Sequence, residues 1–236
     1  MRLPVALALA AAVLVPMPAG IAQAQTTHTC FGEPATVVGT PGDDELQGDV
    51  VVGLAGVDDI GGRLVCGGKD GDWHLSGIKV NGGPGDDQEI QLHGSGDLAI
   101  GPAIGGPGND RFLDNNFGDL QPYQVWRGGE GHDRFTPAGG LVDVFYGGAG
   151  NDGTGGGEPN WTERVLRQFG GDGNDGLGGG DSKDKICGGA GDDILNATEF
   201  GNDTIADFID GGDGFDTCIL GVGDRAVNCE DVTVVG

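Results

Sequence analysis

The sequence predicts an all-β protein, a parallel β-roll or β-helix solenoid built from short stacked turns. The hexapeptide Gly-Gly-x-Gly-x-Asp occurs seven times without a mismatch and recurs in looser form at four further places. Three more residues extend it to a nonapeptide with a large apolar residue at the eighth position, which is a solenoid repeat. Glycine supplies 52 of 236 residues without the period of three that collagen needs, so we expect these glycines in turns. The seven copies begin at Gly82, Gly105, Gly128, Gly147, Gly170, Gly188 and Gly211.

The first 24 residues are predicted to be a secretory signal peptide. Arg2 precedes an apolar run over residues 3–15, and Ala22-Gln23-Ala24 forms a small-residue cleavage site. The apolar run is shorter than the roughly 18 residues that a transmembrane helix needs, and no later segment approaches that length. We therefore expect a secreted, extracellular protein without a membrane span, and an N-terminal cap over residues 25–38.

Residues 39–219 are predicted to form the solenoid, followed by a C-terminal cap over residues 220–236. Looser turns begin at Gly39 and Gly53, and a degenerate one at Gly67 contains Asp72. Several later motif starts are 23 residues apart, which predicts one turn per coil and a longer return path. The β-rich segments 89–92 and 141–146 are candidate strands of that path.

The C-terminal third is the densest part of the array. Three contiguous nonapeptides begin at Gly170, Gly179 and Gly188, although Ser182 replaces a glycine in the second. Alternate nonapeptides should lie on the same edge, so the turns at Gly170 and Gly188 should stack. The apolar residues that follow each Asp should point inward, whereas Glu89 and Thr154 occupy that position poorly. The expected inward residues are Phe112, Phe135, Leu177, Ile186, Ile194 and Ile205.

The turn chemistry predicts calcium binding. Glycine-rich turns expose backbone carbonyls, and each closing Asp adds a carboxylate; these are the hard oxygen donors that Ca²⁺ prefers. An ion between stacked turns would draw ligands from both, with Asp175 and Asp193 at the best-supplied site. Because the apolar core is thin, folding should depend on the bound ions.

Composition restricts the partners. The chain has 12 Lys and Arg against 37 Asp and Glu, a formal charge of −25. Such a chain repels phosphate, so nucleic acid and anionic membranes are disfavoured as partners. Calcium ions are the expected partner, and an extracellular polysaccharide or a cell surface is a further candidate.

These motifs resemble the RTX, or haemolysin-type, calcium-binding repeat family over nearly all of residues 39–219. The end of the chain, residues 211–230, also looks like the end of secreted calcium-binding proteins of actinobacteria. The resemblance implies a right-handed parallel β-roll or β-helix with Ca²⁺ at the turns. The Asp at the sixth motif position is the implied metal ligand, carried here by Asp44, Asp58, Asp87, Asp110, Asp133, Asp152, Asp175, Asp184, Asp193, Asp203 and Asp216.

Five cysteines suit disulfide formation in an exported protein. Cys218 and Cys229 are close enough in the sequence to form the favoured bridge, and Cys30 with Cys66 is the second. Cys187 then remains as a buried thiol or an intermolecular partner, because sequence alone does not determine connectivity.

The favoured function is non-catalytic calcium binding coupled to folding. The alternative is a calcium-dependent polysaccharide lyase or epimerase on a parallel β-helix. Its candidate catalytic groups have no recognisable motif, and the tryptophans that could stack on sugars are more easily explained by packing. These groups are Arg63, Arg127, Arg164, Arg167 and Tyr146, and the tryptophans are Trp73, Trp126 and Trp161.

Overall fold

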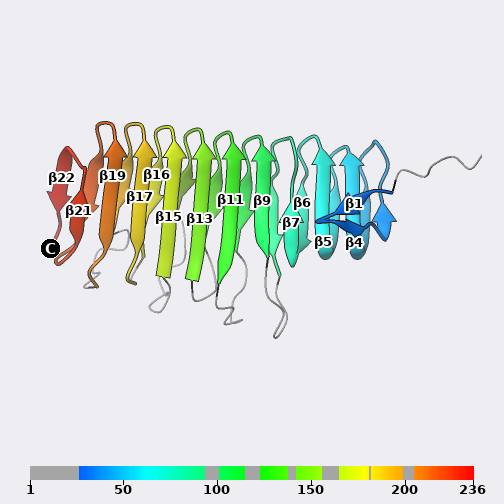
Figure 1. Ribbon diagram of the computed structural model, residues 1–236, viewed down its shortest axis with the longest axis horizontal. Coiled ribbons are helices and arrows are strands. Elements are labelled where there is room, and N and C mark those ends of the chain that lie inside the picture. The colour runs from blue at the N-terminus through cyan, green and yellow to red at the C-terminus, as the bar shows by residue number, and fades with distance from the viewer. Residues whose placement is uncertain are drawn as a thin grey trace, which may run out of the picture.

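The computed structural model describes residues 27–93, 101–114, 123–137, 142–155, 165–180, 182–198 and 205–236, which form a long two-sided parallel solenoid (Figure 1). This part of the chain contains strands and no helix. Every strand pairing in it is parallel except that of β1 with β2. The all-β solenoid predicted from the repeats is therefore confirmed. The predicted signal peptide lies outside the described residues.

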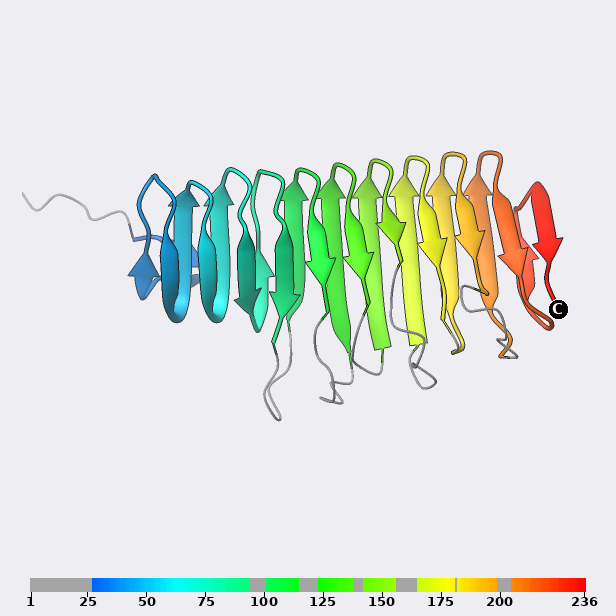
Figure 2. The same cartoon turned by 180° about the vertical axis from the view of Figure 1, so that it is seen from behind.

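Each coil places one strand on each of two faces. We call the face toward the viewer in Figure 1 the front face, and the one seen in Figure 2 the back face. The front strands are β3 (Val37–Val38), β7 (Lys79–Asn81), β9 (Pro102–Pro107), β11 (Gln124–Glu130), β13 (Val142–Ala149), β15 (Val165–Asp172), β17 (Lys185–Ala190), β19 (Phe208–Asp213) and β21 (Arg225–Val227). The back strands are β6 (His74–Gly77), β8 (Glu89–Leu92), β10 (Arg111–Leu113), β12 (Arg134–Thr136), β14 (Gly153–Thr154), β16 (Gly176–Gly178), β18 (Ile194–Asn196), β20 (Thr217–Leu220) and β22 (Asp231–Val234). The long strands β4 (Glu45–Ala55) and β5 (Asp59–Lys69) contribute to both faces.

The two edges of the solenoid differ. At the upper edge in Figure 1, which we call the turn edge, each glycine-rich motif joins a front strand to the next back strand. At the lower edge, which we call the return edge, the chain passes to the next front strand. Front strands run upward and back strands downward while the chain advances from right to left, so the coil is right-handed (Figures 1 and 2). The spacing between stacked turns varies, for example 14 residues in one coil and 23 in another. The expectation of one turn per coil with a longer return path is confirmed.

The core consists of one inward row from each face. Parallel pairing brings equivalent positions of successive coils together, so the rows run along the solenoid. The front row includes Val51, Val65, Val80, Ala103, Trp126, Phe145, Ile186 and Ile209, and the back row includes Ile60, Leu75, Ile90, Phe112, Phe135, Leu177, Leu195 and Cys218. Phe135 stacks on Phe145 with 5.5 Å between ring centroids, which makes the middle of the solenoid its most aromatic part.

Two of the six residues expected to point inward do not. Phe112, Phe135, Leu177 and Ile186 are buried as predicted. Ile194 is 59% exposed, and its neighbour Leu195 is buried in its place. Side chains alternate between the faces of a strand, so only the second residue after the Asp faces inward here. Ile205 is 41% exposed and also lies outside the core.

Glu89 and Thr154, the two residues that suit a core position poorly, are accommodated in different ways. After Asp87 the back strand starts one residue later than in the next coil, so Ile90 pairs with Phe112 and occupies the core instead of Glu89. Thr154 remains in place, and its hydroxyl donates to the buried Gln168 side-chain oxygen at 2.6 Å. The same hydroxyl accepts from the Gly178 backbone N–H at 2.9 Å, so the polar residue is hydrogen-bonded inside the core.

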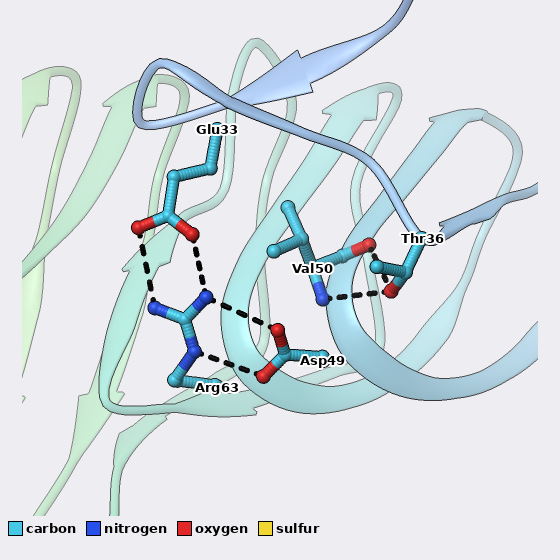
Figure 3. Close-up of polar contacts among 5 residues, drawn as sticks. All are labelled: Glu33, Thr36, Asp49, Val50 and Arg63. Atoms are coloured by element: carbon cyan, nitrogen blue, oxygen red, sulfur yellow. Dashed lines mark hydrogen bonds and ion pairs between the residues drawn. The ribbon is translucent and has the colours of Figure 1, made fainter.

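The N-terminal end is closed by the short hairpin of β1 (Thr29–Cys30) and β2 (Glu33–Pro34). A disulfide joins Cys30 to Cys66 in β5. Arg63 lies between Glu33 and Asp49 and donates to both carboxylates, which links the hairpin to the first coils (Figure 3). Cys218 and Cys229 form the second disulfide, and Cys187 is a half-buried free thiol. The favoured connectivity is confirmed.

Candidate metal sites along the turn edge

The glycines of each motif meet distinct geometric requirements. In the turn that begins at Gly170, the second and fourth residues, Gly171 and Gly173, have φ values of 122° and 130°, which favour glycine. A Cβ on Gly173 would also lie 2.0 Å from the Gly150 carbonyl oxygen of the preceding turn. The first glycine makes room for a side chain, since a Cβ on Gly170 would lie 1.9 Å from Asp175 Oδ2. The motif thus encodes close stacking of turns around a buried carboxylate.

The sixth-position Asp residues form a hydrogen-bonded row, which we call the inner ladder. In each rung the Asp backbone N–H donates to Oδ1 of the Asp in the following rung; Asp175, for example, donates to Asp193 at 2.8 Å. The row ends where the Asp216 N–H donates to a Glu230 carboxylate oxygen at 2.9 Å. Its members are Asp44, Asp58, Asp72, Asp87, Asp110, Asp133, Asp152, Asp175, Asp193 and Asp216.

The second carboxylate oxygen of most of these residues is buried and has no hydrogen-bond partner among the described residues. This holds for Oδ2 of Asp58, Asp72, Asp87, Asp110, Asp133, Asp152, Asp175, Asp193 and Asp216, which are at most 3% exposed. A backbone oxygen lies beside each one in the clearest turns. A Cβ on Gly147 would lie 2.1 Å from Asp152 Oδ2 and 2.6 Å from the Gly170 carbonyl oxygen, so both oxygens face one small region. Buried polar atoms are normally paired, so this repeated exception requires an explanation.

Burial shifts the proton affinity of the inner ladder. Desolvation is the largest cause and raises the pKa of Asp87 to about 8; the hydrogen bond from the Asp72 backbone opposes it, and the neighbouring Asp110 and Asp72 carboxylates add to it. The pKa values of Asp72, Asp110, Asp133 and Asp175 rise to about 7 for the same leading reason. Without a nearby positive charge, these carboxylates are partly protonated at neutral pH.

A second, exposed row runs beside the first, and we call it the outer ladder. It uses the fifth motif position, where Asn109 Oδ1 accepts from the His132 backbone N–H at 2.7 Å. His132 Nδ1 accepts in turn from the Asn151 N–H at 2.7 Å, and Asn151 Oδ1 from the Asn174 N–H at 2.9 Å. His132 is exposed and is a member of this ladder. The outer bonds run from each rung to the preceding one, opposite to the inner bonds.

The structure brings most of the predicted ligand residues together. All of the predicted aspartates except Asp184 and Asp203 lie in the inner ladder, and Asp203 lies outside the described residues. Asp44 differs from the others, because its Oδ2 accepts from the Thr40 N–H at 2.6 Å. The stacking of the turns at Gly170 and Gly188 is confirmed by the bond between Asp175 and Asp193.

Asp184 lies on the return edge. There its Oδ1 accepts from the Leu166 N–H at 2.7 Å, and its own N–H donates to Asp207 Oδ1 at 2.7 Å. Asp207 donates to Asp224 Oδ1 at 2.9 Å, so three aspartates form a short ladder on this edge. Sequence reasoning missed Asp207 and Asp224, which lack the glycine motif. It also left Asp72 out of the ligand set because its motif is degenerate, although this residue occupies the sixth position counted from Gly67.

The fit to a metal ion depends on backbone oxygens. Within the described ranges, no group of three or more His, Cys, Asp or Glu side chains could hold a metal ion. Most turns instead offer one buried carboxylate oxygen close to a glycine carbonyl oxygen of the next turn. Ca²⁺ accepts both donor types, so the arrangement is compatible with Ca²⁺ and poorly suited to metals that require nitrogen or sulfur.

The candidate catalytic groups are partly gathered on the front face. The Arg127 guanidinium lies 4.9 Å from the centroid of the Tyr146 ring, which stacks on Phe169 at 5.0 Å. Arg167 is exposed on the same face, whereas Arg63 belongs to the N-terminal hairpin contact. Trp126 is fully buried in the core, and Trp73 is 60% exposed. Arg164 and Trp161 lie outside the described residues.

A scan against protein-family models matches none of them, and a search of curated proteins finds no match either. Among the described residues, no helix has the length and apolarity needed to cross a membrane.

Proposed function

We propose that this chain is a secreted calcium-ion-binding repeat protein of the haemolysin-type class, with folding coupled to Ca²⁺. The supporting observation is the row of buried carboxylate oxygens without hydrogen-bond partners. Rungs of a parallel sheet are about 4.8 Å apart, so ionised neighbours would repel each other by about 3 kcal/mol at an effective dielectric of 20. Cations held between the turns would remove this repulsion and supply the missing partners.

The proposed ligands are Oδ2 of the inner-ladder aspartates and the carbonyl oxygen of the first glycine in the following turn. A bound ion would supply positive charge where two turns meet and would tie adjacent rungs together. Asp44 and Asp184 are weaker candidates, because their Oδ2 atoms already accept backbone hydrogen bonds. Asp175 and Asp193 lie in successive rungs in the densest part of the array and remain the best candidate pair.

Circular dichroism with chelator and with added Ca²⁺, combined with calorimetric titration, tests this proposal. We expect weaker β-structure in chelator, recovery with Ca²⁺, and little recovery with Mg²⁺ at equal concentration. The double variant Asp175→Ala, Asp193→Ala should bind fewer ions, whereas Asp172→Ala removes one exposed carboxylate of the same turn and should bind as many as the unaltered chain. A circular dichroism spectrum that does not change with Ca²⁺, together with a calorimetric titration that shows no Ca²⁺ binding, would contradict the proposal.

We further propose that the protein is exported and non-catalytic. The two disulfides suit an oxidising compartment, which agrees with the predicted signal peptide. On the front face, Arg127 and Tyr146 contact each other over an aromatic stack, which gives both side chains a packing role. Incubation with polyuronates should give no new reducing ends, no unsaturated sugars and no change in uronate stereochemistry. Reproducible products from the purified protein would instead establish the lyase or epimerase alternative.

A further inference from the structure

Two adjoining hollows open on the back face over β12 and β14. One has a volume of about 370 Å³ and lies toward the turn edge, where it is lined by His132, Asn151, Gly153 and Thr154 and by the buried inner-ladder residues Asp133 and Asp152. The other has a volume of about 400 Å³ and is lined by Arg111, Arg134, Thr136 and Gly155. Arg134 lines both hollows, so together they form one depression along the strand direction, which we call the arginine hollow.

One strand glycine, Gly153, lines the arginine hollow, and a second, Gly176, lies on the next strand without lining it. Gly153 and Gly176 pair in register on β14 and β16. Unlike the second and fourth glycines of each exact motif, neither is among the residues with positive φ. A Cβ would meet nothing within 4 Å at Gly176, and only the Gly176 carbonyl oxygen at 3.6 Å at Gly153. Neither glycine is required by the backbone, and glycine in a strand often marks the close approach of a ligand.

One wall of the hollow carries two arginines side by side. Arg111 and Arg134 are register partners on adjacent parallel strands, and both are exposed. Among the described residues, ion pairs involve only Arg63 and His74, so neither of these arginines has a carboxylate within 4.0 Å. Like charges on adjacent strands repel, and this occurs in a chain with 37 acidic residues available for pairing. The two guanidinium groups are therefore available to an external anion.

We propose that the arginine hollow binds an anionic sugar unit of an acidic polysaccharide. Guanidinium groups recognise carboxylate and sulfate through paired N–H donors, and the Thr136 hydroxyl and exposed glycine backbone give the rest of the lining a polar character. A single sugar chain is narrow enough to lie against the hollow without covering the acidic remainder of the molecule. The inference rests on the two arginines rather than on ion binding at Asp133 and Asp152, which line the turn-edge end of the hollow, and the test therefore uses Ca²⁺-saturated protein.

Other anionic partners fit less well. A peptide strand could not add to the sheet here, because β14 is already paired on both sides by β12 and β16. Duplex nucleic acid and membranes present wide anionic surfaces, which the formal charge of −25 opposes. A narrow polar anion is the occupant that charge and shape favour.

The test is calorimetric titration of the Ca²⁺-saturated protein with short oligogalacturonate, a dextran sulfate oligomer and neutral dextran of similar length. We expect binding of at least one anionic oligomer and none of dextran, and the preferred oligomer identifies carboxylate or sulfate as the recognised group. The double variant Arg111→Ala, Arg134→Ala should bind at least about tenfold more weakly. Gly153→Val, which places a side chain in the hollow, should weaken binding similarly at an unchanged melting temperature and Ca²⁺ stoichiometry.

The matched control is Arg167→Ala with Arg225→Ala, which removes two exposed charges from the front face. This variant should keep its affinity within about twofold, since distant exposed charges contribute little. The proposal is overturned if neither anionic oligomer binds, if dextran binds equally well, or if the control variant loses as much affinity as the site variant.

Discussion

At the scale of single residues, the glycines divide into those that the turn requires and those that it does not. Gly150 has a φ of 131°, and a Cβ there would lie 1.8 Å from the Gly131 carbonyl oxygen. A Cβ on Gly176, by contrast, would meet no other atom within 4 Å. Identical substitutions at these two places should therefore have opposite effects, although both residues stand in repeats of the same array.

We expect Gly150→Ala to destabilise the protein by about 2 kcal/mol or more, because strain and a backbone clash act together. Gly176→Ala should stabilise it by about 0.4 to 1 kcal/mol by restricting the unfolded chain. Urea denaturation in saturating Ca²⁺ measures both free energies of unfolding. Equal losses for the two variants would contradict the stacking geometry of the turns.

The inner-ladder carboxylates predict an unusual dependence of stability on pH. Their pKa values rise on folding from an ordinary 3.8 to about 7 at Asp110 and about 8 at Asp87, so the folded state binds more protons between these values. The metal-free protein should thus gain stability as the pH falls from about 8 toward 4, the reverse of ordinary acid denaturation. Melting temperatures in chelator across this range provide the measurement. Saturating Ca²⁺ should flatten the profile, because the ion replaces the protons.

At the scale of elements, the sequence predicts the turns better than the strands. The motif specifies φ values and close contacts locally, so most of the inner ladder follows from the spacing of the aspartates. Strand register depends on the residue count after each Asp, and one extra residue moves Ile90 into the core instead of Glu89. Asp207 and Asp224 could not be found by motif, because neighbouring coils rather than local glycines place them. The arginine hollow likewise arises from stacking of residues 23 positions apart.

The end elements depend on covalent bonds. The Cys30–Cys66 disulfide closes a loop with a sequence separation of 36, so Cys30→Ser should destabilise the protein by about 3 to 4 kcal/mol on the chain-entropy model. Cys187→Ser should change stability little, since this cysteine forms no disulfide. Denaturation curves compare the stabilities of the two variants. For the unaltered protein, mass spectrometry after alkylation should find one reactive thiol per unfolded, unreduced chain. More than one alkylated cysteine would contradict the pairing.

At the scale of the whole molecule, the two ladders connect each turn to both neighbours in opposite senses. An inner bond runs from Asp133 to Asp152, while the outer bond between the same rungs runs from Asn151 back to His132. Register can therefore change only by whole coils, because any smaller slip breaks both rows together. The solenoid behaves as a series of discrete units whose stability is shared between neighbours.

Deletion of one complete coil tests this unit behaviour. Removing residues 105–127 joins Ile104 to Gly128, and Ile104 already occupies the register position of Arg127. We expect a shorter protein that unfolds cooperatively with a smaller m-value, since less surface is buried. Removing residues 105–126 instead shifts the following strands by one residue and exchanges their faces, so this matched variant should fail to fold. Similar behaviour of the two deletions in circular dichroism and urea titration would contradict the model.

The unequal coil lengths have a practical consequence. Successive rungs of the inner ladder are separated by 14, 15, 18, 19 or 23 residues, yet the hydrogen bonds between them keep nearly the same length. The differences in coil length therefore fall on the return edge, while the turn edge stays regular. Foreign peptides grafted between a back strand and the next front strand would therefore be displayed in a line, at intervals fixed by the sheet, without disturbing the motifs opposite.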